Sequence, residues 1–237
     1  MIKLSRSTVE RYINCPRCCF LEKKHNIRYP SLPFTLNIAV DNLCKNEFDF
    51  YRTRAEPHPI FIEHGLDAIP FAHPKMNEWR NNLKGLRYIS KQNGYDFGGA
   101  LDDIWLKSNG QLIVADVKCT AKKNFNWSET FSKYNYAKGY KRQLEMYQWL
   151  LKKNGFAVAD EAYIVYFNGR KNDQFFKQQL KFDLHLIKLD CNTEWVEQKI
   201  LEVIKVLNSN QVPPAFNSCE YCSYLKKRWH LSRQRNK

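Results

Sequence analysis

The fold is decided by GGALDDIWL at residues 98–106, SNG at 108–110 and LIVADVK at 112–118. Two β-prone apolar runs flank a set of turn-forming residues, which predicts a β-hairpin. Both runs are apolar on both faces, which is typical of strands that other elements cover on each side. We therefore expect this hairpin in the middle of a sheet, where its three carboxylates and its lysine call for a chemical explanation.

The register of the hairpin decides which of its carboxylates meet. A three-residue loop at 108–110, with its glycine left-handed, places Asp102 opposite Asp116, whereas a two-residue turn would place Asp103 there. Side chains alternate along a strand, so Asp116 and Lys118 point the same way. Either register brings two carboxylates and one ammonium together on one strand pair, and we expect Asp102 to be the partner of Asp116.

The paired carboxylates repel each other, by roughly 4 kcal/mol for charges about 4 Å apart at an effective dielectric constant near 20. One lysine offsets part of this repulsion, and a divalent cation would offset the rest. Hard oxygen ligands in this number suit magnesium or manganese. The alternative is a structural salt bridge at the sheet edge without a metal, and the residues alone leave both interpretations open.

The composition favours a folded protein with a polyanionic partner. Hydrophobic residues make up 43% of the 237 residues and aromatic residues 14%, which argues against a disordered chain. No run approaches the roughly 18 apolar residues of a membrane span. The first residues lack the apolar core of a signal peptide, so we expect a cytoplasmic protein without a membrane partner. The net charge of +14 favours nucleic acid as the partner, through counterion release.

The eight cysteines include two Cys-x-x-Cys pairs, Cys15 with Cys18 and Cys219 with Cys222. In a cytoplasmic chain such pairs are more typical of metal ligands than of disulfides. Four thiolates are the number that closes a tetrahedral zinc site or holds an iron–sulfur cluster. Because the pairs lie near opposite ends of the chain, we expect one metal centre that joins the two termini. Cys19 adjoins Cys18 and is expected to turn away from it.

The hairpin residues carry a resemblance to a known family. Gly99-x-x-Asp102 followed by Asp116-x-Lys118 resembles the core motif of the PD-(D/E)XK nuclease superfamily. This resemblance implies a metal-dependent phosphodiesterase in which Asp102 and Asp116 are metal ligands and Lys118 orients the attacking water. The carbonyl of Val117 is a further ligand candidate.

Other motifs resemble the RecB-like branch of that superfamily, which includes CRISPR-associated exonucleases and helicase-linked recombination nucleases. A helix followed by Cys-Pro-Arg at 15–17 is one such motif. Gln143 and Tyr147, four apart on one helical face, match the Gln-x-x-x-Tyr motif, which implies a contact to DNA near the metal and a place in the catalytic set. Asp41, on an amphipathic helix expected at 36–51, is the candidate for a further metal ligand, with a solvated helix face as the alternative.

The cysteines fit the RecB-like branch only in part. Many of its members hold a four-iron cluster with one N-terminal and three C-terminal cysteines, whereas this chain divides them two and two. The resemblance therefore implies a 4Fe-4S cluster, while the paired spacing favours a structural zinc ion. The ligands are expected to be Cys15, Cys18, Cys219 and Cys222.

Further patterns predict the remaining elements. They are a helix capped by Ser5 or Ser7, a strand at 86–90, a helix at 137–153, strands at 161–168 and 176–189, and a helix at 193–208 capped by Thr193. Residues 22–34 are expected to be a connection, residues 53–85 irregular and residues 224–237 a solvated basic tail. Residues 120–136 interleave lysines with aromatic residues, which suits either stacking on unpaired bases or a loop that covers the core.

This order of elements resembles the restriction-endonuclease-like α/β fold, with a mixed central sheet flanked by helices and the termini joined by the cysteine site. We expect one domain over residues 1–237, with cysteine segments at 15–19 and 219–222. The expected function is a magnesium- or manganese-dependent DNA nuclease, an exonuclease acting on DNA ends or single strands. The alternatives are a non-catalytic nucleic-acid-binding subunit of a repair or CRISPR-type complex, and a structural metalloprotein.

Overall fold

The structure is a computed structural model that describes residues 1–28 and 34–234. Its chain forms two compact units, one of residues 1–32, 90–96 and 194–237, the other of residues 33–89 and 97–193. None of the helices in these described ranges is long and apolar enough to cross a membrane. The expectation of a single domain over 1–237 stays a prediction.

The first unit contains the two ends of the chain. Its elements are β1 (Ile2–Ser5), α1 (Arg6–Asn14), α2 (Pro16–His25), α8 (Trp195–Asn208) and α9 (Glu220–Gln234). Ser5 caps α1 as predicted, because its hydroxyl accepts a hydrogen bond from the Thr8 amide at 3.3 Å. Pro16 begins α2, a position where its missing N–H costs nothing. Both α1 and α2 pack against α8, whose Val196, Ile200 and Val203 are buried.

The second unit is built on a five-stranded sheet with the order β2-β5-β6-β7-β8. The strands are β2 (Ile69–Pro70), β5 (Asp103–Leu106), β6 (Leu112–Thr120), β7 (Glu161–Gly169) and β8 (Phe182–Asp190), and the helices are α3 (Thr35–Arg54), α4 (Pro59–Glu63), α5 (Met76–Trp79), α6 (Trp127–Lys133) and α7 (Asn135–Lys153). Only β6 and β7 pair in parallel, and the connection between them contains α6 and α7, as parallel pairing requires. A second sheet has the order β1-β4-β3 and includes the hairpin of β3 (Leu86–Ser90) and β4 (Tyr95–Gly99). The predicted α/β fold with a mixed central sheet flanked by helices, restriction-endonuclease-like, is confirmed.

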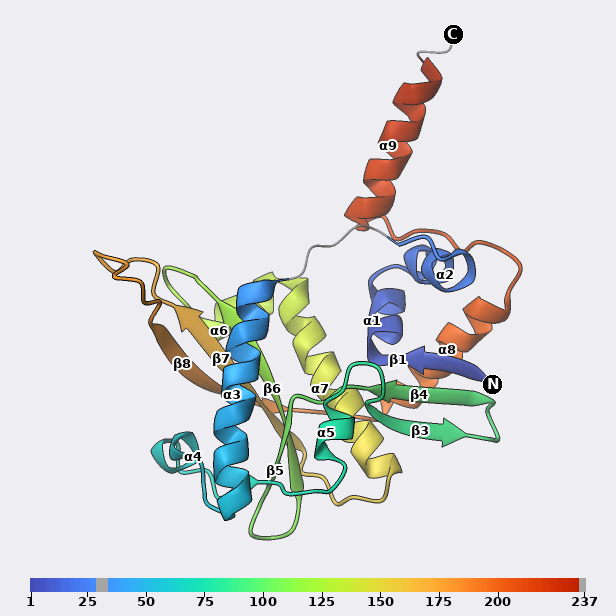
Figure 1. Cartoon of the computed structure of the whole chain (residues 1–237). Helices are drawn as coiled ribbons and strands as arrows, with labels where there is room; N and C mark the ends of the chain where they lie inside the picture. The colour runs from blue at the N-terminus through green and yellow to red at the C-terminus, as the bar shows by residue number, and fades with distance from the viewer. Residues whose placement is uncertain (29–33, 235–237) are drawn as a thin grey trace. The chain divides into compact units, whose positions relative to one another are not determined.

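Helices α3 and α7 both pack against β6 (Figure 1). Alternation along this strand divides its side chains between two environments. Ile113, Ala115 and Val117 join an apolar cluster with Phe48 of α3 and Phe61 of α4. The residues between them face the other way, where α7 packs against the strand. This second face carries Asp116 and Lys118.

The predicted register of the hairpin is confirmed. Asp103 pairs with Ala115 and Leu106 with Leu112, so the loop holds three residues and Gly110 adopts the left-handed conformation, with a φ of 82°. Residues 98–106 do not form one strand, however. Strand β4 ends at Gly99 and β5 begins at Asp103, because the Leu101 amide donates to the Trp79 carbonyl at 3.0 Å and draws the chain away.

Several expected boundaries differ from those of the structure. Strand β8 begins at Phe182 rather than 176, since residues 170–181 form a longer connection. Helix α8 begins at Trp195 with Glu194, not Thr193, at its N-cap. Helix α2 continues to His25 into the expected connection, whose residues 29–33 lie outside the described ranges.

Other segments expected to be irregular contain helices. Residues 53–85 include the short α4 and α5 and strand β2. Residues 120–136 include α6. The expected solvated tail forms most of α9, from Glu220 to Gln234, and its lysine and arginine side chains lie at exposed positions.

His58 connects α3 to α4 through both of its ring nitrogens. Its Nδ1 accepts a hydrogen bond from the Ile60 amide at 3.1 Å and caps α4. Its Nε2 lies 3.2 Å from Glu47 Oε1, and its ring stacks on Phe48 with centroids 4.4 Å apart. This arrangement requires an unprotonated Nδ1, and burial lowers the pKa of His58 from its usual 6.5 although Glu47 and Asp103 oppose this.

We expect the stability of the protein to fall as the pH decreases through 6.5, in part because of His58. A histidine whose folded pKa is lowered binds its proton more readily in the unfolded chain, so its contribution is present above pH 6.5 and is lost below it. Denaturant unfolding of wild type and His58→Asn at pH 7.5 and 5.5 measures this, since asparagine retains a capping oxygen without titrating. An equal loss of stability in both proteins would contradict the assignment.

Candidate active site and metal site

Asp116 and Lys118 lie near the end of β6, beside the parallel strand β7. Asp116 is fully buried, and the Lys118 ammonium donates to its Oδ2. The same ammonium lies 3.3 Å from the Val117 carbonyl oxygen. The side chains that the sequence predicted on one strand face are therefore in direct contact.

Asp102 completes this group from the segment just before β5. Its Oδ2 accepts a hydrogen bond from the Val117 amide at 3.1 Å, and its carboxyl group lies close enough to that of Asp116 for each to shift the pKa of the other. Its Oδ1 accepts from Lys45 of α3 at 3.0 Å. Asp102, rather than Asp103, thus faces Asp116, as the three-residue loop predicted.

Asp103 points elsewhere and belongs to a separate ion-pair network. It is buried and accepts from Arg52 of α3 and from Arg80, the latter at 3.1 Å. Arg80 also bonds both oxygens of Asp49, at 2.8 and 2.9 Å. A buried carboxylate between two guanidinium groups is fully paired, so Asp103 has a structural role that ties α3 to the hairpin.

The two facing carboxyl groups have pKa values shifted in opposite directions. Burial raises the pKa of Asp116 to about 7, with Asp102 adding to this effect and Lys118 opposing it. Burial alone would also raise the pKa of Asp102, but Lys118 and Lys45 lower it to about 2. The two carboxyl groups therefore differ in how fully the neighbouring lysines balance their charge, Asp102 more and Asp116 less.

Asp41 of α3 adds a third carboxylate to this group. Its Oδ2 accepts from Lys45 at 2.7 Å, and its Oδ1 is buried without a hydrogen-bond partner. Burial and then Asp102 raise the pKa of Asp41, which means that its charge is incompletely balanced. An unpartnered buried carboxylate oxygen suits a hard divalent cation. The carboxylate oxygens of Asp41, Asp102 and Asp116 do not, however, all lie within 4.8 Å of one another, and the Lys45 ammonium lies between Asp41 and Asp102.

Lys45 is the residue of this group that the sequence interpretation missed. Its ammonium lies between Asp41 and Asp102 and bonds both. The spacing of four between Asp41 and Lys45 on a helix was the available indication. Asn37, one turn before Asp41, donates to the Cys119 carbonyl at 3.2 Å and joins the start of α3 to β6.

Gln143 and Tyr147 lie on the face of α7 that covers the charged side of β6. The Gln143 amide donates to Asp116 Oδ1 at 2.6 Å and to the Tyr147 hydroxyl at 3.2 Å. Both side chains are buried, with exposed fractions of 7% and 2%. They share a site with Lys118, and in this structure Gln143 holds the Asp116 carboxyl group in place.

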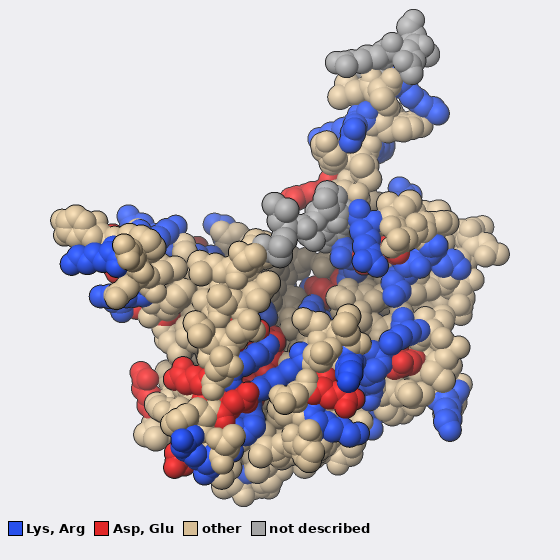
Figure 2. Space-filling view, in the orientation of Figure 1, with Lys and Arg blue, Asp and Glu red and all other residues tan. Residues whose placement is uncertain are grey.

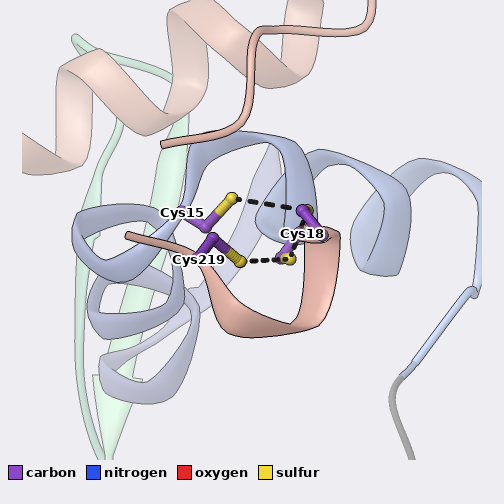
Figure 3. A group of neighbouring side chains, drawn as sticks. Cys15, Cys18 and Cys219 are labelled. Carbon is purple, nitrogen blue, oxygen red and sulfur yellow. Dashed lines mark hydrogen bonds between the residues drawn. The ribbon is translucent and has the colours of Figure 1, made fainter. Parts of the chain in front are cut away.

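The four paired cysteines come together in the first unit, as predicted (Figure 3). The Sγ of Cys18 lies 3.7 Å from that of Cys219 and 3.5 Å from that of Cys222. Cys15 lies 3.9 Å from Cys222. All four Sγ atoms lie within 4.8 Å of one another. Within residues 1–28 and 34–234, no other three or more histidine, cysteine, aspartate or glutamate side chains bring their ligand atoms this close together.

Each Cys-x-x-Cys pair is presented by the start of a helix. Cys15 precedes α2 and Cys219 precedes α9, so that Cys18 and Cys222 lie in the first turns. Burial tends to raise the pKa of Cys15, but hydrogen bonds from the Cys18 and Phe216 amides outweigh it and lower this pKa to about 7. Amides at a helix start favour a thiolate, which is the form that binds metal.

Cys19 turns away from the cluster, as its position beside Cys18 predicted. Its Sγ donates to the Thr8 carbonyl oxygen, 3.6 Å away. Burial raises the pKa of Cys19 to about 11, so it is a neutral thiol in the core of the first unit. The cluster joins the N-terminal and C-terminal segments, as expected, and could bind a metal ion.

A comparison with protein families agrees with this geometry. The model of the PD-(D/E)XK nuclease superfamily matches residues 36–226. Among solved structures, the chain is similar to SSO0001, with 17% identity, a TM-score of 0.46 and coverage of 93% of this chain and 82% of that one. It is also similar to a "Putative exonuclease" from Eubacterium rectale, with 14% identity, a TM-score of 0.46 and coverage of 93% and 86%. No curated protein matched.

We expect Cys18→Ser to reduce the metal content of the purified protein and its thermal stability. Metal binding at such sites contributes on the order of 10 kcal/mol to folding, so the loss of one ligand is severe. Plasma mass spectrometry and a thermal melt measure the two effects. Cys191→Ser is the matched control, because the Cys191 thiol donates only to the Leu189 carbonyl. Wild-type metal content in Cys18→Ser would contradict a shared site.

Proposed function

Because the chain belongs to the PD-(D/E)XK nuclease superfamily, we propose that it is a metal-dependent DNA nuclease. The observation that supports this most strongly is the contact of Asp116 with Lys118, with Asp102 bonded to the neighbouring Val117 amide and one buried Asp41 oxygen left without a partner. A salt bridge that served stability alone would not require three carboxylates and two lysines with one buried oxygen left unsatisfied.

Magnesium or manganese would be held by Asp41, Asp102, Asp116 and the Val117 carbonyl. When bound, such an ion polarises the scissile phosphate and lowers the pKa of a bound water. Lys45 already neutralises part of the charge of Asp41 and Asp102. The remaining charge on these carboxylates is what the ion would balance.

Lys118 is proposed to orient the attacking water and to stabilise the charge that develops on the phosphate. Its ammonium is held by Asp116 and lies near the Val117 carbonyl, so it is fixed beside two proposed metal ligands. Burial would lower the pKa of Lys118, but the neighbouring carboxylates raise it, and it remains a cation. Gln143, with Tyr147 behind it, acts as a positioning residue for Asp116.

The proposed substrate is DNA, attacked at ends or in single strands. The net charge of +14 favours a polyanion, and Figure 2 shows lysine and arginine side chains spread over the visible face. The Gln143-x-x-x-Tyr147 spacing and the Cys-Pro-Arg segment support a place in the RecB-like branch. A repair or CRISPR-type complex is the partner that this branch implies.

The alternative is a nucleic-acid-binding subunit without catalysis. Binding alone needs positive charge, which the chain has, and does not need the buried carboxylates of the hairpin. The intact set of Asp102, Asp116 and Lys118 therefore favours catalysis.

We expect Asp116→Asn and Lys118→Ala each to reduce magnesium-dependent cleavage of labelled DNA by about a hundredfold or more. The first removes a proposed ligand, and the second removes the ammonium beside it. Gel-based cleavage of single-stranded and duplex DNA, with magnesium or with a chelator, measures the effect.

Matched controls lie on β8, where Asp190→Asn and Lys188→Ala change the same residue types at exposed positions. These controls should cleave as the wild type does. Circular dichroism establishes that all four variants fold. Undiminished cleavage by both Asp116→Asn and Lys118→Ala would exclude the proposed site.

For the cysteine cluster we propose one structural zinc ion. A tetrahedron with metal–sulfur bonds of about 2.3 Å has sulfur–sulfur edges of about 3.8 Å. Three of the sulfur–sulfur distances in the cluster are 3.5 to 3.9 Å, and the others are within 4.8 Å. A four-iron cluster is larger and requires its cysteine sulfurs to lie farther apart. The spacing of these sulfurs therefore supports zinc over the 4Fe-4S cluster that the RecB-like resemblance implies.

Protein purified without oxygen is expected to be colourless and to contain one equivalent of zinc. Elemental analysis and an absorption spectrum recorded before and after reduction provide the measurement. Visible absorption that bleaches on reduction, together with four irons per chain, would instead identify the cluster.

A further inference from the structure

Three tyrosines form a ladder, a series of neighbouring rings, that begins in the connection between α6 and α7 and continues into α7. The rings of Tyr134 and Tyr136 are stacked, with centroids 5.4 Å apart and an interplanar angle of 24°. Tyr136 and Tyr140 follow with centroids 5.6 Å apart. The three rings thus make one continuous aromatic surface.

Lysines accompany this ladder along its length. The Lys122 ammonium lies 4.7 Å from the centroid of the Tyr134 ring and 5.8 Å from that of Tyr136. Lys133 lies 5.5 Å from the Tyr134 ring. At the inner end, the Lys118 ammonium lies 4.9 Å from the Tyr140 ring. The ladder therefore ends at the ammonium that contacts Asp116.

The outer rings are open to solvent. Tyr134 is 38% exposed and Tyr136 is 40% exposed, whereas Tyr140 is half-buried. The other aromatic residues of this segment are accounted for by packing, since Phe125 lies 4.6 Å from both Tyr166 and His185 and Trp127 lies 6.1 Å from Tyr166, centroid to centroid. Packing against neighbouring rings thus accounts for the presence of Phe125 and Trp127 in this segment. It does not account for Tyr134 and Tyr136, which are partly exposed to solvent.

We infer that the ladder of Tyr134, Tyr136 and Tyr140 is a stacking site for the unpaired bases of single-stranded DNA. Base–aromatic stacking next to cationic side chains is how proteins bind single strands without sequence preference, and Lys122 and Lys133 are placed to contact the phosphates. Bases in a duplex stack on one another, so their faces are not available to the tyrosines. This inference rests on the proposed nuclease function, because the ladder would lead a strand to Lys118.

Binding to a fluorescent single-stranded oligonucleotide, measured by anisotropy with a chelator and at fixed salt, tests the inference without catalysis. The double variant Tyr134→Ala/Tyr136→Ala is expected to bind roughly tenfold more weakly or worse, since each stacked base contributes substantially. Its affinity for a blunt duplex should change less than twofold. Tyr134→Phe/Tyr136→Phe retains the rings and should bind as the wild type does.

Phe50→Ala is the matched control, because it also removes an exposed aromatic ring that lies beneath a cationic side chain. Phe50 lies on α3, and the Arg54 guanidinium carbon is 3.5 Å from its ring centroid. It lies outside the ladder, so this variant should keep the wild-type affinity for single strands. A loss as large as that of the tyrosine variant would overturn the inference.

Photo-cross-linking gives a readout that does not depend on a variant. A single strand that contains 5-iodouracil forms a covalent adduct with an aromatic ring on which the base is stacked, and peptide mapping should place the adduct on Tyr134 or Tyr136. Adducts found only elsewhere, wild-type affinity in the alanine variant, or binding of RNA but not DNA would each overturn the inference. Wild-type protein that binds and cross-links through the ladder but cleaves no DNA would overturn the proposed catalysis and leave the ladder supported.

Discussion

The contact between Asp116 and Lys118 is the interaction on which the arrangement of the second unit depends. A fully buried carboxylate in a strand is costly unless it is paired, and Asp116 is satisfied by Lys118 and by Gln143 of α7, while Asp102 faces it from the hairpin. Each partner comes from a different segment. The burial of one charge therefore fixes the positions of α7 and of the hairpin around the end of β6.

Two adjacent aspartates of the hairpin serve different purposes because the chain bends between them. Asp102 precedes β5 and faces Asp116, while Asp103 begins the strand and is enclosed by Arg52 and Arg80. The arginine network ties α3 to the hairpin, which holds Asp41 and Lys45 near Asp102. A structural ion pair thus supports the candidate catalytic group without belonging to it.

The first unit follows another principle, since a group of sulfurs rather than a buried charge joins its distant segments. Cys18 and Cys222 lie in the first turns of α2 and α9 and face each other, and Cys15 and Cys219 directly precede these helices. Four thiols packed this closely gain little from one another. A metal ion bound by all four sulfurs would join the two ends of the chain through its coordination bonds.

Sequence alone determined the hairpin register, the meeting of Asp102 with Asp116, the cluster of four cysteines and the helices α1, α3, α7 and α8, because these follow from local periodicity and from residue spacing. It did not determine where β4 ends, since a hydrogen bond from Leu101 to the distant Trp79 decides this. It also did not determine that Lys45 lies between Asp41 and Asp102. Nor did it determine that Asp103 forms ion pairs with Arg52 and Arg80. These depend on how α3 packs against the hairpin, and contacts between segments far apart in the chain leave no periodic pattern in either segment.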